Sequence, residues 1–342
     1  MHAEKVVEAW FLHEKLALSL LSENDAQTLT RQIPAPEEPF AQMMRTELFE
    51  RALTTYLVSN DIHSLAVEQL HERLALGQLV WLDQAIAFKG VGAALKKVRE
   101  GSQGRASFSA RLATKSETRV VGSYDAAKLT CNSAPGQLSG TKRQFILGYI
   151  SELSDDEIGL RPIVIATRWL KPPTSRFSRL STDDAHLWPA SVDQFAEVDF
   201  RKRLSASDLN VLRDVPEQSI KESFADILGE PDVPNDWGGE QFDLWSTDRL
   251  TVNGEPLRTA FMFKGPAKFS PMTIAALGKN GDQIDRLAQT AADLMVVQHC
   301  HSIRAPVLNM LKAYATNPRD PKRYMTIDGY STIRILRHFG KL

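Results

Sequence analysis

Apolar residues in the first hundred positions recur mainly at the spacing expected for helices. The pattern predicts amphipathic helices over 3–22 and 40–58, and another helix that begins near Ser64. A short helix is predicted over 93–98, whereas 79–88 is apolar enough to be either a helix or a strand. The chain is therefore expected to begin with a helical part whose apolar faces pack against a core or a partner protein.

The pattern then changes to that of strands. The segments 107–113, 118–124, 143–153 and 162–170 contain many β-branched and aromatic residues, and turns rich in Gly, Ser and Pro separate them. They predict a small β-rich unit without a catalytic motif. This unit could be a second nucleic-acid contact, a partner-binding surface or a structural platform. The basic stretch 171–181 has the Pro and Ser content typical of a linker.

Strand and helix patterns alternate in the last third of the chain. Asn253-Gly254 predicts a tight turn between two strands, and Pro216 suits the first turn of a helix. The predicted elements are a helix over 216–228, strands near 241–246, 249–253 and 259–264, a helix over 281–290, a strand over 293–301, a helix over 304–315, a strand over 323–327 and a helix over 332–340.

These patterns predict an α+β or α/β protein. A helical lead and a β-rich unit occupy 1–171, a linker occupies 172–204, and an α/β domain with a mixed central sheet occupies 205–342. The length of 342 residues also favours more than one domain.

Composition narrows the classes of function. The net charge is −1, but the segment 257–342 contains 13 Lys and Arg against 5 Asp and Glu. A locally basic segment is compatible with phosphate contacts, although a solvated surface explains it equally well. No GxSxG, GxGxxG, P-loop or HExxH motif occurs, which argues against several common enzyme classes.

The expected location is the cytoplasm, with no membrane partner. Only Cys131 and Cys300 are present, without a CxxC pair, so no disulfide framework is indicated. Charged residues interrupt the apolar pattern of the first 21 residues, and no apolar run approaches the roughly 20 residues of a membrane span. A homo-oligomer or a protein partner bound through the N-terminal part remains open.

Two charged residues near strand ends indicate a candidate chemistry. Asp243 lies on one predicted strand, and Lys264 ends the strand after the turn. Neighbouring strands can bring the two side chains to one edge of a sheet. A carboxylate binds Mg²⁺ through oxygen, and a lysine beside it can neutralise phosphate charge and position water. The pair therefore suggests metal-assisted hydrolysis of a phosphodiester.

This arrangement resembles the PD-(D/E)xK nuclease superfamily, which has the restriction-endonuclease-like fold, from about Ser205 to the C-terminus. The resemblance implies a Mg²⁺-dependent endonuclease, with Mn²⁺ as a substitute, that processes DNA in restriction, defence or repair. Asp243 matches the first motif acid, and Lys264 matches the motif lysine. Glu222 matches an acid on the preceding helix, and Gln283 matches a glutamine on the helix after the lysine strand.

The sequence departs from the family pattern at Met262, where the family has Glu or Asp. A metal site would then need Asp243 with Glu222 and Glu240, or an oxygen from Asp282. The alternative is a catalytically inactive nuclease-fold protein that binds DNA or assembles with partners. A third alternative is an unrelated fold, in which Asp243 is a strand-end residue and the other candidates are solvated.

Basic and histidine residues complete the set of candidates. The predicted phosphate contacts are Lys268, Lys279, Arg334 and Arg337. Lys279 precedes a helix start, which attracts anions but is equally typical of a turn capped by Asn280 or Asp282. Arg334 and Arg337 share a helical stripe with His338 and Lys341, and a cationic last turn also suits the helix dipole.

Two histidines suggest a metal site of another kind. His299 and His301 would share one face of the strand predicted over 293–301, which is a possible start for a zinc site. The chain offers no second pair with finger-like spacing. Packed strand residues are therefore the default interpretation.

Overall fold

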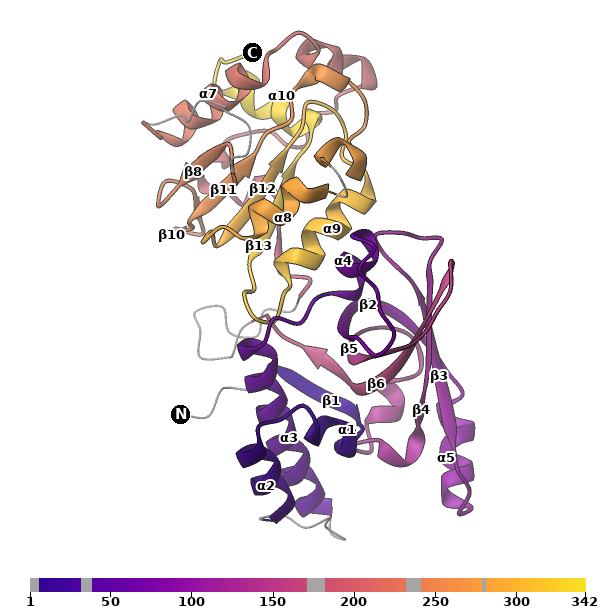
Figure 1. Cartoon of the computed structure of the whole chain (residues 1–342). Helices are drawn as coiled ribbons and strands as arrows, with labels where there is room; N and C mark the ends of the chain where they lie inside the picture. The colour runs from indigo at the N-terminus through magenta and orange to yellow at the C-terminus, as the bar shows by residue number, and fades with distance from the viewer. Residues whose placement is uncertain (1–5, 32–38, 171–181, 232–240, 279–280) are drawn as a thin grey trace. The chain divides into compact units, whose positions relative to one another are not determined.

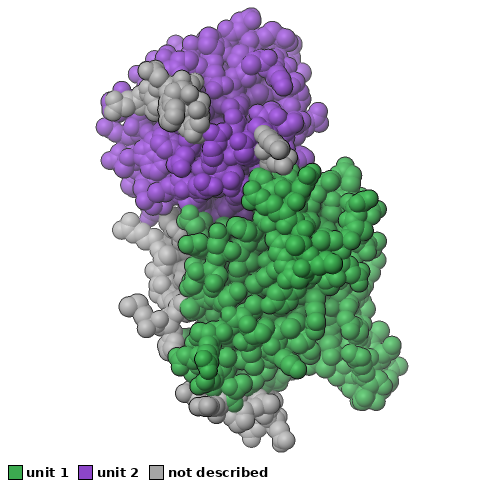
Figure 2. Space-filling view, viewed as in Figure 1, with its two compact units in different colours: residues 1–182, 317–321 green, residues 183–316, 322–342 purple. Residues whose placement is uncertain are grey.

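The structure is a computed structural model that describes residues 6–31, 39–170, 182–231, 241–278 and 281–342. The chain divides into two compact units (Figure 2). Unit 1 comprises Met1–Thr182 and Asn317–Pro321, and unit 2 comprises Asp183–Thr316 and Lys322–Leu342. No helix in the described part combines the length and apolar character that crossing a membrane requires.

Unit 1 is built on a six-stranded sheet (Figure 1). Its strands are β1 (Val7–Leu12), β2 (Leu79–Lys89), β3 (Arg105–Arg111), β4 (Arg119–Asp125), β5 (Gly140–Leu153) and β6 (Glu157–Arg168). Its helices are α1 (Glu14–Leu18), α2 (Glu23–Arg31), α3 (Pro39–Ser59), α4 (Leu65–Leu70), α5 (Val91–Arg99) and α6 (Ala134–Gln137), with a 3-10 turn η1 (Ala126–Lys128).

The sheet of unit 1 closes into a Greek-key barrel. Strands β2, β3 and β4 form an antiparallel meander, and β5 returns beside β2. Strand β6 then closes the barrel, because it pairs antiparallel with β5 and parallel with β4. Strand β1 pairs with the second half of β6, outside this circuit.

Aromatic side chains fill part of the barrel interior. Phe88 lies 6.2 Å from Phe108 and 6.4 Å from Tyr124 between ring centroids. Gly122 on β4 faces the same space, where an added Cβ would lie 2.2 Å from Phe108 Cζ. The ring of Phe108 therefore requires glycine at this position.

Helix α3 covers part of the barrel's outer surface, and its side chains bind backbone N–H groups of the edge strand β1. Buried Phe49, Leu53 and Leu57 on α3 belong to the core cluster that includes Phe145 and Val164 of the barrel. Glu50 accepts a hydrogen bond from Ala9 N (2.7 Å), and Thr54 accepts one from Val6 N (3.1 Å). These side chains satisfy backbone donors that the edge strand cannot pair with another strand.

The helix predicted over 3–22 is wrong in its first half. Residues 7–12 form β1, and the helix α1 begins only at Glu14. Nearly every residue of β1 is buried, because it lies between β6 and α3. A strand that is buried on both faces has no alternation that distinguishes it from a helix.

Unit 2 contains a five-stranded mixed sheet of order β7-β13-β12-β11-β8. Its strands are β7 (His186–Leu187), β8 (Leu244–Ser246), β11 (Thr259–Met262), β12 (Leu294–Gln298) and β13 (Arg323–Ile327), and β9 (Thr251–Val252) and β10 (Glu255–Pro256) form a separate hairpin. Only β8 is antiparallel to its neighbour. The predicted α+β class with a mixed sheet is thus confirmed.

Helices lie on both faces of this sheet (Figure 1). They are α7 (Glu217–Leu228), α8 (Asp282–Ala288), α9 (Ala305–Ala315) and α10 (Gly329–His338). Phe224 of α7 and Leu336 of α10 pack in one core cluster with Phe261 and Phe263. Helices α8 and α9 pack against β11 and β13 on the other face.

The predicted hairpin turn is confirmed, but its strands lie outside the central sheet. Asn253 and Gly254 both have positive φ, 52° and 75°, as a two-residue type I′ turn requires. The strand predicted over 249–253 therefore pairs with β10 and not with β8 or β11. The restriction-endonuclease-like arrangement stays a prediction.

Residues 183–204, which the sequence patterns assigned to a linker, are part of unit 2. They contain β7 and the 3-10 turns η2 (Pro189–Ser191) and η3 (Asp193–Phe195). Val192, Phe195 and Val198 are buried in the core of the unit. Residues 171–181 lie outside the described residues.

Capping side chains set the starts of two helical segments of unit 2. The turn η4 (Ala206–Leu212) is capped by Ser205, whose N donates to Asp208 Oδ2 (2.7 Å). Asp328 caps α10, because its Oδ1 accepts from Ser331 N (2.8 Å), so this helix begins at Gly329 and not at the predicted 332.

A buried ion pair in unit 1 gives a stability prediction. Arg168 Nε donates to Asp83 Oδ2 (3.3 Å), and its guanidinium lies over the rings of Trp81 and Phe145. Burial lowers the pKa of Arg168, and Asp83 opposes this shift. Asp83→Ala removes the carboxylate from a buried cation, so we expect a loss of about 3–5 kcal/mol in the free energy of unfolding. Denaturant unfolding measures it.

The control is Glu47→Ala. Glu47 forms an exposed i,i+4 pair with Arg51 at 2.7 Å, and its removal should cost less than about 0.5 kcal/mol. Equal losses in the two variants would contradict the assigned role of Asp83.

Candidate functional site

Asp243 and Lys264 lie at one end of the neighbouring strands β8 and β11. Asp243 directly precedes β8, and Lys264 follows β11 by two residues. The antiparallel pairing ends with Leu244 opposite Phe261, and Asp243 N donates to Phe261 O (2.8 Å) just beyond this last pair. Asp243 therefore lies beside the end of β11, close to the main chain around Lys264.

Two carboxylates hold the backbone on either side of Lys264. Asp243 Oδ2 accepts a hydrogen bond from Phe263 N (2.6 Å). Glu217, the first residue of α7, accepts one from Gly265 N through Oε2 (2.5 Å). Gly265 is needed here, because an added Cβ would lie 2.6 Å from Glu217 Cβ. Acidic groups from two different elements thus flank the lysine.

The end of β12 fixes Lys264 from the other side. Lys264 N donates to Gln298 O (3.1 Å), and Lys264 O accepts from Cys300 N (3.3 Å). His299 Nδ1 lies 3.0 Å from Lys264 O, and His299 Nε2 lies 3.0 Å from Ser270 O. A neutral imidazole has one N–H, so it donates to one of the two carbonyls, and the protonated ring donates to both.

These contacts argue against the zinc interpretation. Strand β12 ends at Gln298, so His299 and His301 lie beyond the strand on which they were predicted to share a face. Both ring nitrogens of His299 face carbonyl oxygens. His301 Nδ1 accepts from Ser302 N (2.8 Å), and its ring packs edge-on against Phe269. Both histidines hold loops together.

Gln283 and Asp282 are the first two residues of α8, which packs beside β11. Gln283 Oε1 is buried and makes no hydrogen bond within the described residues. Such an acceptor is rare in folded proteins and is accounted for by a water, an ion or a ligand. Asp282 turns toward the loop before the helix, since a Cβ on Gly278 would lie 1.8 Å from its Oδ1.

The helical acid that binds the main chain next to Lys264 is Glu217, and the sequence patterns did not identify it. Glu222, which was predicted for this role, is exposed, and its Oε1 accepts from Gln218 Nε2 (2.8 Å). Glu217 was missed because its contact with Gly265 joins residues 48 positions apart. Its place in the first turn of a helix is the only local signal. Glu240, the other predicted ligand, lies outside the described residues.

Of the basic residues predicted to contact phosphate, some are exposed to solvent and others bind groups within the protein. Lys268 is exposed at the end of η5 (Pro266–Lys268), four residues after Lys264, and Lys279 lies outside the described residues. Arg334 donates from Nε and Nη2 to Lys202 O (3.0 and 2.9 Å). Two of its five N–H donors are thus used within the protein, and its phosphate contact stays a prediction.

The rest of the cationic stripe on α10 also has partners in the protein. Lys341 forms an ion pair with Asp226 of α7. Hydrogen bonds from Ser205 lower the pKa of Asp208, and the charge of Arg337 adds to this effect. The stripe therefore stabilises unit 2, although Arg337 itself is exposed.

The oxygen donors present fit Mg²⁺ better than zinc. Within the described ranges, no group of three or more His, Cys, Asp and Glu side chains is arranged to hold a metal. Mg²⁺ usually needs only one or two protein carboxylates and takes its other ligands from water and substrate phosphates. Asp243 and Glu217 offer two carboxylates, whereas Met262 is buried and its thioether is a poor ligand for a hard cation.

Comparisons with known proteins supply no relative from which to infer a function. The chain matches no protein-family model, and no curated protein or solved structure matches it significantly. The function must therefore come from the chemistry of the site.

The two cysteines give a prediction about the site's packing. Burial raises the pKa of Cys300, which follows His299, to about 11, whereas Cys131 is exposed. Near neutral pH a thiol reagent should modify one thiol rapidly and the second only after unfolding, because the thiolate is the reactive form. Counting the modified thiols against time measures this.

Cys131→Ala should remove the rapid phase. Rapid modification of the Cys131→Ala protein would show that the end of β12 is open, in contradiction to the packing described.

Proposed function

We propose that unit 2 binds nucleic acid, in particular DNA, at the Lys264 edge of its sheet and hydrolyses a phosphodiester there with Mg²⁺ or Mn²⁺. The observation that carries the proposal is the pair of carboxylates, Asp243 and Glu217, that bind the backbone N–H groups of the residues before and after Lys264. A lysine flanked by oxygen donors suits a phosphate group and a hard cation together.

The residues have separate roles in this proposal. Lys264 binds the phosphate and offsets the negative charge that grows on it during hydrolysis. Asp243 and Glu217 would hold the metal ion, which supplies an activated water and polarises the phosphate when bound. Gln283 has a buried acceptor, Oε1, that can orient a water molecule or a hydroxyl group.

The biological setting belongs to the same proposal. It comprises a restriction-endonuclease-like fold for unit 2, a role in restriction, defence or repair of DNA, and a cytoplasmic location.

Met262 favours a second candidate, a protein that binds DNA at this edge without cutting it. Met262 is 5% exposed and stands two residues before Lys264, where the resemblance to the nuclease superfamily implies a second carboxylate. One oxygen of Asp243 is also engaged by Phe263 N. With fewer oxygen ligands, this edge of the sheet would still have Lys264 to bind phosphate but would not hold a metal ion.

A cleavage assay tests the first candidate. Purified protein should nick plasmid DNA in Mg²⁺ or Mn²⁺ and not in EDTA. Lys264→Ala and Asp243→Asn should each slow cleavage by roughly 100-fold or more, because the first removes the cation that offsets phosphate charge and the second weakens the hold on the metal ion. Glu217→Gln should also slow it, since the amide keeps an acceptor for Gly265 N but lacks the charge.

The matched control is Glu222→Gln, which changes an exposed carboxylate on the same helix and should leave the rate within about twofold of wild type. Wild-type protein that binds DNA in a salt-sensitive way that depends on Lys264, without cleaving it, supports the second candidate. A protein that neither cleaves nor binds nucleic acid contradicts both.

A further inference from the structure

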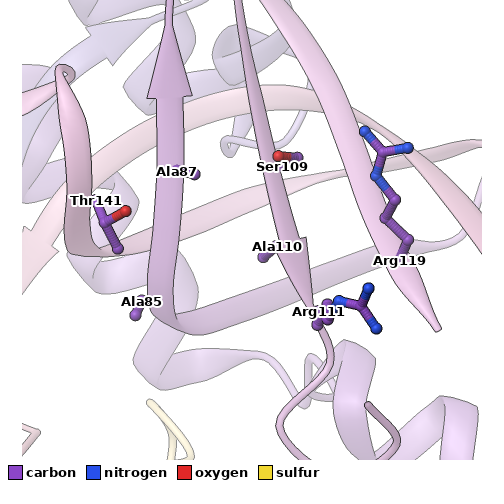
Figure 3. A pocket seen from close by; sticks show the side chains of 7 residues that line it. All are labelled: Ala85, Ala87, Ser109, Ala110, Arg111, Arg119 and Thr141. Carbon is purple, nitrogen blue, oxygen red and sulfur yellow. The ribbon is translucent and has the colours of Figure 1, made fainter. Parts of the chain in front are cut away.

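The outer surface of the barrel in unit 1 has a hollow of about 430 Å³. Its floor consists of small side chains, Ala85 and Ala87 on β2 and Ser109 on β3, and Thr141 of β5 lies at one side (Figure 3). The volume falls within the range of roughly 300–1,000 Å³ that is usual for small-molecule sites. The hollow is thus large enough for a nucleotide-sized ligand.

Two arginines border the hollow. Arg111 of β3 and Arg119 of β4 are directly opposite each other in the antiparallel pair. Like charges in this position destabilise a sheet. Arg111 Nη1 donates to Ser116 O (3.1 Å), and Arg119 Nη1 lies 3.5 Å from Glu157 Oε2. The carboxylate of Glu157 pairs with Arg119, whereas Arg111 binds a neutral carbonyl, which leaves the border cationic.

The sequence of these strands fits an open surface and not a packed one. Along β3, Ser107, Ser109 and Arg111 point outward, while Ala106 and Phe108 are buried. The outward positions of β5 that α3 covers, in contrast, include Phe145 and Leu147. Small polar and cationic side chains do not form a docking face for an apolar helix. They suit a hydrated, anionic ligand.

We propose that this hollow binds a nucleoside phosphate, with the phosphate held between Arg111 and Arg119. Guanidinium groups form bidentate, charge-assisted hydrogen bonds with phosphate. A phosphate bound between the two arginines would therefore attract both and offset the unfavourable interaction between them. The sugar or base then lies over the methyl groups of Ala85 and Ala87, and Thr141 offers a hydroxyl group.

The ligand is either a free nucleotide or one nucleotide of a single strand. Both present the same phosphate and ring. This inference does not rest on the proposed function of unit 2, because the residues involved are all in unit 1.

Binding by the full-length protein in EDTA tests the proposal. The probes are a fluorescent single-stranded oligonucleotide, followed by anisotropy, and adenosine monophosphate and inorganic phosphate, followed by calorimetry. Arg111→Ala and Arg119→Ala should each weaken binding of the responding probe by about tenfold or more, and for the oligonucleotide should reduce the salt slope by about one. Ala85→Glu should also weaken binding, because it places a carboxylate on the floor.

Arg105→Ala is the matched control. Arg105 lies on the same strand and donates to Ser123 Oγ (2.6 Å), but it does not line the hollow. Its removal also lowers the positive charge by one, so it should change affinity by less than about twofold. The ligand should raise the Tm of wild type and of Arg105→Ala, but not that of the Arg111→Ala/Arg119→Ala protein.

Each outcome decides the question. Binding of the oligonucleotide without the mononucleotide assigns the hollow to a strand, and binding of the mononucleotide assigns it to a free nucleotide; both support the proposal. Equal losses for Arg105→Ala and Arg111→Ala overturn it, as does the failure of all three probes to bind wild type. Oligonucleotide binding that depends on Lys264 and not on Arg111 or Arg119 also overturns it, whatever the cleavage assay shows.

Discussion

The arrangement of unit 2 around Lys264 depends on the need to pair backbone donors and acceptors where strand β11 ends. The antiparallel neighbour β8 ends there as well, so the N–H of Phe263 has no strand partner on that side and is taken by the Asp243 side chain. On the other side, β12 continues for two pairings, through Gln298 O and Cys300 N. Lys264 is therefore held by its own main chain, and its side chain starts from a fixed point.

The need to pair backbone N–H groups also explains why two acids lie near Lys264 although they do not form a complete set of metal ligands. Asp243 and Glu217 each satisfy an N–H group, and a carboxylate is a stronger acceptor for this purpose than a neutral group. A structural role and a chemical role are compatible, because a carboxylate has two oxygens and several lone pairs. A metal site at this edge would thus be built on groups that already shape the fold. Folding and catalysis can be separated by amide variants, which keep the acceptor and remove the charge.

Local chemistry was sufficient to predict some elements and insufficient for others. The long helix α3, the helix α7 after Pro216 and the Asn253-Gly254 turn follow from periodicity and turn geometry, and all three are present. The closure of the barrel depends on pairings such as Phe145 with Ala166, and no local pattern encodes them. Strand β1 was mistaken for a helix because tertiary burial on both faces removes its alternation.

The candidate site divides in the same way. The sequence placed an acid and a lysine at the ends of two strands, and in the structure the side chain of Asp243 accepts a hydrogen bond from Phe263 N, next to the lysine. It could not reveal Glu217, whose contact is made through the packing of α7 on the sheet, nor the carbonyl partner that occupies Arg334. The strand-end residues were found because a strand pattern and a turn precede them in the sequence, whereas the partners of both the strand ends and the helix surfaces come from distant segments.

Net charge limits how this protein could bind nucleic acid at all. With a total of −1, no long-range field attracts a polyanion, so affinity must come from a few well-placed cations. Unit 1 shows two ways of placing arginine. Arg168 is buried and matched by Asp83, so it stabilises the fold and is not accessible to a ligand. Arg111 and Arg119 are exposed and occupy directly opposite positions on β3 and β4. Like charges at opposite positions are unfavourable in a sheet, so an anion bound there would gain from both cations independently of the net charge of the protein.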